Sequence, residues 1–203
     1  MGAACLPARE AFIQEVSQPD EDINLLAAGL LLAAEEYPGL DLIACQGRVA
    51  LLAQRARAAL TARHSVYDAV HAINQIMFDE EGFRGNAQTY YDPRNSYLNE
   101  VLDRRLGIPI TLAVIYQDVA RRLGHRLRGI GMASHFLLAA GQGASEIYVD
   151  PFNNGGLLSR REGLALALRG QDSPRGTMAG LTRRLLPVFD KRATLRRMLN
   201  NLK

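Results

Sequence analysis

The hydrophobic periodicity of this chain changes once, near His125, and that change limits the fold more than any other feature. Before it, apolar residues recur at the three- and four-residue spacing of amphipathic helices. After it, short apolar runs are separated by glycine-containing turns, a pattern typical of strands. Helices followed by a small antiparallel sheet predict an α+β fold.

Capping residues and helix breakers locate the expected helices. They lie at residues 20–37, 42–60, 65–78, 96–105 and 109–123. Ser65 suits an N-cap, and Pro109 suits the first turn of a helix, where a missing N–H costs nothing. Gly124 stands where a left-handed residue closes a helix. The helical pattern thus continues up to the change of period.

The second part of the chain is expected to begin with three strands. They lie at residues 126–130, 135–140 and 146–149, followed by a loop at 151–156, a helix at 160–169, a loose segment at 171–180 and a basic helix at 191–202. The chain then divides into an N-terminal helical region (1–80), a core (81–160) and a C-terminal extension (161–203).

Composition and charge exclude several classes of protein. No apolar run is long enough to span a membrane, and the first ten residues lack the pattern of a secretory signal, so a cytoplasmic protein is expected. The two cysteines have no metal-ligand spacing, and we expect no metal and no cofactor. The net charge is only +3, and aromatic residues do not interleave with the basic residues after Ser159, which argues against nucleic-acid binding.

Three positions could together form a site. If the strands at 135–140 and 146–149 run antiparallel, their outer ends bring His135 beside Asp150, where a carboxylate can orient an imidazole. The helix that begins at Pro109 would then direct the positive end of its dipole towards this pair. This is the chemical environment in which a thiolate is stabilised.

This order of elements resembles the transglutaminase-like superfamily, which has a papain-type fold. The Gly-x-Cys pattern of that superfamily matches Gly107-Ile108-Pro109, so the resemblance places Pro109 at the position of the nucleophilic cysteine. It places the histidine of the triad at His135 and the aspartate at Asp150. The resemblance therefore implies a catalytic triad without its nucleophile.

A closer resemblance is to a bacterial family described as transglutaminase-like with tetratricopeptide repeats, the Sir-B-one type, which is also similar to part of a eukaryotic F-box protein. The run YYDPRNSYLNEVLDRRLGIPITLAVIYQDVARRLG, at residues 90–124, carries it. RMLNNLK, at 197–203, resembles the segment that leads into the repeats, and the repeats themselves are absent. Family members of this type generally carry Gly-Ile-Pro-Ile, so the resemblance implies that the proline is a family trait.

Neither neighbouring hydroxyl is expected to replace the nucleophile. Thr111 lies roughly 200° around the helix from Pro109, and Ser134 lies on the opposite face of a strand from His135. The leading hypothesis is a catalytically inactive module that binds a protein or peptide. Its expected binding residues are Asn95, Ser96, Asn99, Arg105 and Thr111.

Other interpretations stay open. His135 and Asp150 could contact each other for stability alone, and Asn95 could serve only to cap a turn. A hydrolase or acyltransferase would use the same pair with water or a nucleophile other than cysteine. A nucleic-acid adaptor would use the C-terminal basic helix and would bind with a steep dependence on salt.

Overall fold

The fold is taken from a computed structural model, which describes residues 7–169 and 178–202. The helices are α1 (Ala8–Ser17), α2 (Leu25–Glu36), α3 (Leu42–Ala58), α4 (Val66–Asn74), α5 (Leu98–Arg104), α6 (Pro109–Arg122), α7 (Arg160–Ala167), α8 (Met178–Leu185) and α9 (Lys191–Asn201). The strands are β1 (Arg84–Gly85), β2 (Leu106–Gly107), β3 (Arg128–Gly131), β4 (Phe136–Ala140), β5 (Ile147–Asp150), β6 (Gly156–Leu158) and β7 (Val188–Phe189). Short turns of other helix types are η1 (Gln75–Glu80), η2 (Pro93–Ser96), η3 (Gly143–Ser145) and η4 (Pro151–Asn153).

The larger sheet is antiparallel throughout, with the order β6-β5-β4-β3-β7. Its centre is the meander that the sequence predicts, in which Leu138 lies opposite Val149 and Ile130 opposite Leu137. The mixed helical and antiparallel architecture confirms the prediction of an α+β fold. A separate parallel pair, β1 with β2, joins the segments before and after α5.

Local capping explains where the helices begin. Ser65 and Asp68 form a capping box at the start of α4, as the sequence predicts for Ser65. The predicted helix at 20–37 begins later, at Leu25, because Asn24 is its N-cap and accepts from the N–H of Ala27. Gly124 follows α6 with a φ of 94°, the conformation expected there.

The loose segment predicted at 171–180 is only partly described. Residues 170–177 lie outside the described residues, and 178–180 are the start of α8, so for these three positions the prediction is wrong. α8 is amphipathic and packs against α7, so tertiary contacts favour a helix there. The predicted loop at 151–156 gives way at its last residue to β6, which pairs with β5.

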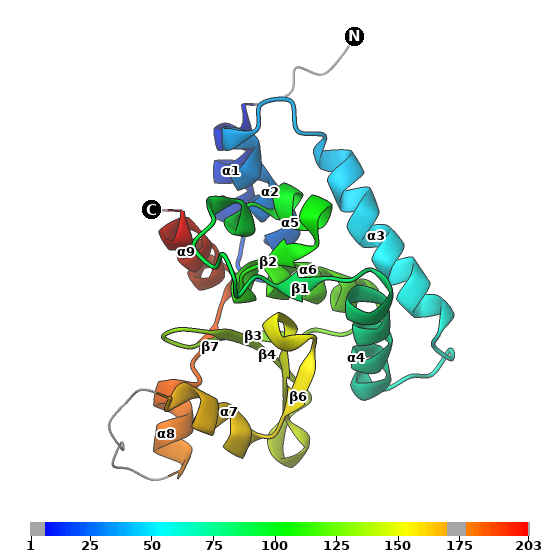
Figure 1. Cartoon of the computed structure of the whole chain (residues 1–203), viewed down its shortest axis with the longest axis vertical. Helices are drawn as coiled ribbons and strands as arrows, with labels where there is room; N and C mark the ends of the chain where they lie inside the picture. The colour runs from blue at the N-terminus through cyan, green and yellow to red at the C-terminus, as the bar shows by residue number, and fades with distance from the viewer. Residues whose placement is uncertain (1–6, 170–177, 203) are drawn as a thin grey trace.

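Both faces of the sheet are covered (Figure 1). On one face Phe136, Leu138 and Ala140 join a large core with α6 and the N-terminal helices. On the other face Leu137 and Ala139 join a smaller core under α7 and α8. Because both sets of alternating residues are buried, β4 is a continuous apolar run rather than an alternating one.

The large core extends from Ile23 to Met198 and draws on all three predicted regions, 1–80, 81–160 and 161–203. Helix α9 packs back on α2 and α6. The three-region division itself stays a prediction. Among the described helices, none combines the length and the apolar character that crossing a bilayer requires.

Candidate functional site

His135 and Asp150 meet at one end of the sheet. His135 directly precedes β4, and Asp150 is the last residue of β5. Nε2 of His135 lies 2.9 Å from Oδ1 of Asp150, and the side chains are 12% and 5% exposed. The contact has the distance of an ion pair, but the N–H direction is not aligned for a hydrogen bond to any described residue. The antiparallel register thus brings the two residues together as expected.

Asp150 also organises the turn that follows it. Oδ1 accepts from the backbone N–H groups of Phe152 and Asn153, and Oδ2 accepts from the side-chain amide of Asn153 at 2.7 Å. Burial by itself would raise the pKa of Asp150, but His135 and Asn153 outweigh it and hold the pKa below the ordinary value. The carboxylate therefore stays charged and fixes η4.

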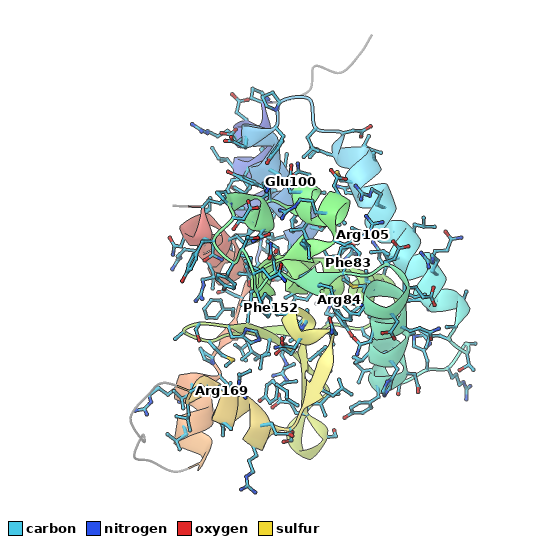
Figure 2. The ribbon with its side chains drawn as sticks, in the orientation of Figure 1. Phe83, Arg84, Glu100, Arg105, Phe152 and Arg169 are labelled. Atoms are coloured by element: carbon cyan, nitrogen blue, oxygen red, sulfur yellow. The ribbon has the colours of Figure 1, made fainter. Side chains whose placement is uncertain are left out.

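One aromatic ring packs on the imidazole, and two more continue from it. The ring of Phe152 meets His135 edge to face, with centroids 5.9 Å apart, and Tyr90 packs on Phe152 at 6.0 Å. Tyr91 extends this series and is 93% exposed. Figure 2 shows Phe152 where the helical layer meets the sheet. The guanidinium of Arg197 donates to two carbonyls of the loop before His135, which ties α9 to the site.

Pro109 is the first residue of α6 and is buried. Helix α6 packs against both η4 and β4, the elements that adjoin Asp150 and His135. Pro109 offers no reactive atom in this helix start. The one cysteine among the described residues, Cys45, is buried in α3, and this burial raises the pKa of its thiol. Cys5 lies outside the described residues.

Two of the predicted binding residues form hydrogen bonds inside the fold. Thr111 is fully buried; its Oγ1 accepts from the N–H of Ile108 and donates to the carbonyl of Asn95 at 2.8 Å. The side-chain amide of Asn95 donates to the carbonyls of Thr89 and Tyr90. These bonds join the loop before η2 to the start of α6.

The other three predicted binding residues differ from one another. Arg105 donates to Glu81 at 2.9 Å and stacks on Phe83, with its guanidinium carbon 5.6 Å from the ring centre (Figure 2). Ser96 and Asn99 are buried, and Oδ1 of Asn99 has no hydrogen-bond partner among the described residues. For all five residues, the binding role stays a prediction.

The structure contains two cavities that no sequence pattern predicts. One, of about 820 Å³, lies between the sheet and helices α7 and α8, and its lining includes Arg128, Glu146 and Arg160. The other, of about 520 Å³, lies where the segment before α2 meets α6 and α9. Neither is lined by His135, Asp150 or Pro109. Each lining is assembled from short segments that are far apart in the sequence, so no local pattern predicts it.

The described residues contain no group of three or more histidine, cysteine or acidic side chains placed to hold a metal ion. The arrangement at His135 offers an oriented imidazole, a buried charged carboxylate and an aromatic border. The imidazole of this arrangement can act as a proton acceptor or contact a ligand. It lacks a described side chain that could act as a thiol or hydroxyl nucleophile from position 109.

Comparisons with known proteins agree with this architecture. A family model described as "Transglutaminase-like superfamily" matches residues 44–200. A UPF0162 protein of Xylella fastidiosa is 41% identical over 143 residues, which cover 70% of this chain and 51% of that protein. A UPF0162 protein of Vibrio cholerae is 32% identical over 138 residues, or 66% and 51% of the two chains. F-box only protein 21 of Mus musculus is 37% identical over 139 residues, or 64% of this chain and 21% of that protein.

The chain thus spans about half the length of the bacterial relatives it matches. No solved structure matches it.

Proposed function

We propose that this chain, which belongs to the transglutaminase-like superfamily, is a protein- or peptide-binding or regulatory module that catalyses no acyl transfer. Within the superfamily we assign it to the Sir-B-one type and its domain to the papain-type fold. The similarity to bacterial UPF0162 proteins and the run at 90–124 support this assignment. The observation that carries the functional proposal is Pro109 at the start of α6.

Acyl transfer by a triad needs a nucleophile, and loss of the nucleophile prevents formation of an acyl-enzyme however well the other groups are placed. Proline has no side-chain heteroatom. The hydroxyl of Thr111 already donates to a backbone carbonyl in a fully buried position. The thiol of Cys45 is buried with a raised pKa, which disfavours the reactive thiolate.

The surroundings of His135 support a binding role. The charge of Asp150 holds η4 in place, and η4 carries Phe152 against the imidazole. Beyond Phe152, the rings of Tyr90 and Tyr91 extend to a side chain that is almost fully exposed. Tyrosine presents a large apolar surface with a polar tip, which suits contact with a peptide. We propose that a peptide segment of a partner protein contacts Tyr91 and its neighbours.

A second candidate function is hydrolysis with His135 as general base. The observation that favours it is the contact with Asp150, because an imidazole oriented by a carboxylate can take a proton from water. This mechanism requires that water or substrate reach the partly exposed ring of His135.

A panel of acyl-transfer, amidase and protease substrates distinguishes the two functions. We expect no turnover by the wild type, and therefore no change in His135→Ala. His71→Ala is a control, because His71 is an exposed histidine on α4. Turnover that disappears in His135→Ala and persists in His71→Ala would contradict the binding module and support the hydrolase.

A further inference from the structure

The larger cavity lies on the face of the sheet opposite α6, under α7 and α8. Its volume, about 820 Å³, is in the range of pockets that hold small organic ligands. We propose that this cavity binds a small organic phosphate, a phosphomonoester that carries an apolar group. The proposal is independent of the function assigned to His135, which does not line the cavity.

The charged side chains of the lining are predominantly basic. Three arginines, Arg128, Arg160 and Arg183, line the cavity together with a single carboxylate, that of Glu146, so two positive charges are in excess. Glu146 already interacts with both Arg128 and Arg160 and accepts from the hydroxyl of Tyr148 at 2.8 Å. A phosphomonoester carries between one and a half and two negative charges near neutral pH, by analogy with a phosphorylated side chain, and so matches the excess, roughly.

Glu146 remains an anion despite its burial. Burial by itself would raise its pKa, but hydrogen bonds from Tyr148, Arg128 and Arg160 outweigh it, so the pKa is lowered. The carboxylate therefore holds the two guanidinium groups beside each other. A pair of arginines held in this way is preorganised, which reduces the entropy lost when a ligand binds.

The arginines also keep donors for a ligand. The hydrogen bonds that Arg128 and Arg160 make to described residues all use Nη2: to Glu146 and Gly141 from Arg128, and to Glu146 and Gly143 from Arg160. Each guanidinium has five N–H donors in a planar fork, a geometry that fits phosphate oxygens. Arg183 makes no ion pair to a described residue and is exposed.

An apolar wall completes the cavity. Ile130 and Leu186 are buried side chains of the smaller core, and Val188 is 56% exposed at the same site. Burial of apolar ligand surface against these residues favours an organic phosphate over the inorganic ion.

Calorimetric titration with phenyl phosphate tests the proposal. We expect saturable binding by the wild type and binding weaker by about fivefold in Arg183→Gln, the effect of losing one exposed charge pair. Arg184→Gln is the matched control. Arg184 is exposed on the same helix and its loss removes the same charge, but it does not line the cavity, so we expect unchanged affinity.

Two further measurements test where the ligand binds and which class of ligand binds. Amide resonances of 128–130 and 146–148 should shift on titration, and inorganic phosphate should bind more weakly than phenyl phosphate. The proposal is overturned if phenyl phosphate shows no saturable binding, or if Arg183→Gln and Arg184→Gln lose equal affinity. It is also overturned if the amide shifts are confined to other elements, or if inorganic phosphate binds as tightly as phenyl phosphate. Because His135→Ala leaves this cavity intact, its effect on turnover tests the proposed function separately.

Discussion

Asp150 is a buried carboxylate that stays charged because of the groups around it. His135 lies 2.9 Å from one oxygen, and Asn153 donates to both oxygens through its backbone and its side chain. Burial opposes the charge, yet the pKa lies below the ordinary value for aspartate, about 3.9. The charged form of Asp150 thus stabilises the fold at pH values above the pKa that Asp150 has in the unfolded chain. This contribution is lost as the pH falls through the pKa of Asp150 in the folded protein.

Replacement of His135 by alanine should raise the pKa of Asp150, because burial persists while the largest opposing interaction disappears. The variant should also lose stability on acidification at a higher pH than the wild type. A carbon-detected NMR titration of the carboxyl group measures the first effect, and unfolding by urea at several pH values measures the second. His71→Ala serves as control. An unchanged pKa in His135→Ala would show that the contact carries no electrostatic interaction.

For single residues, the sequence predicts some contacts in the site but not all of them. The meeting of His135 and Asp150 follows from two short strands and a turn, so it could be predicted. The hydrogen bond from Thr111 to Asn95 could not be predicted, because the partner lies sixteen residues away in the chain. The bond with Ile108 had a local signal, a hydroxyl three residues after the N-cap, because a side chain there can accept from the N–H of the N-cap residue.

The elements around the site pack closely at one glycine. A Cβ at Gly85 would lie 2.4 Å from the carbonyl oxygen of Phe152 and 2.5 Å from its ring. A backbone oxygen cannot move aside as the end of a flexible side chain can. β1 and η4 can therefore pack together only because residue 85 has no side chain.

Gly85→Ala should destabilise the protein by about 1–3 kcal/mol, as overpacking does in a close contact. Gly47→Ala is the control, because Gly47 is exposed within α3 and an added Cβ would meet nothing within 4 Å. We expect that control to gain about 0.5–1 kcal/mol from the removal of a flexible helix residue. Urea unfolding measures both. A neutral Gly85→Ala would mean that η4 can move away from β1.

Helices with a clear hydrophobic periodicity and with capping or helix-breaking residues at their ends could be predicted from the sequence. Examples are α3, α4 and α6. β7 could not be predicted in this way. It consists of Val188 and Phe189, and it exists because these residues pair with Ile130 and Gly129 of β3, an interaction with no local signal. Tertiary pairing decides such short strands, so single-sequence patterns do not reveal them.

Across the whole molecule, the segment before α2 is joined to the start of α9. The carboxylate of Asp20 accepts from the backbone N–H groups of Lys191 and Arg192, at 3.2 and 3.1 Å. These are the first residues of α9, so Asp20 supplies a second cap beside Asp190, the N-cap of that helix. The core that continues from this junction includes both Ile23 and Met198. The sequence pattern could not show this, because the partners are 171 residues apart.

Asp20→Ala should lower the free energy of unfolding by about 0.5–2 kcal/mol, the range for loss of a helix cap. Amide exchange should accelerate first in α9. Asp22→Ala removes an exposed carboxylate from the same segment and should change stability by less than about 0.5 kcal/mol. Equal effects of the two substitutions would show that Asp20 contributes only its charge.

We propose that position 109, at the start of α6, lies close enough to His135 for a cysteine there to complete a triad, and the thiol pKa of Pro109→Cys is the decisive measurement. The measurement is the pH dependence of thiolate absorbance, as a difference from the wild type. For Pro109→Cys we predict a thiol pKa below the ordinary value of about 8.5, because the imidazole and the start of α6 stabilise the thiolate. In the double variant Pro109→Cys with His135→Ala, the thiol pKa should return towards that value. A thiol pKa at or above the ordinary value that does not respond to His135→Ala would show that position 109 and His135 do not form one site.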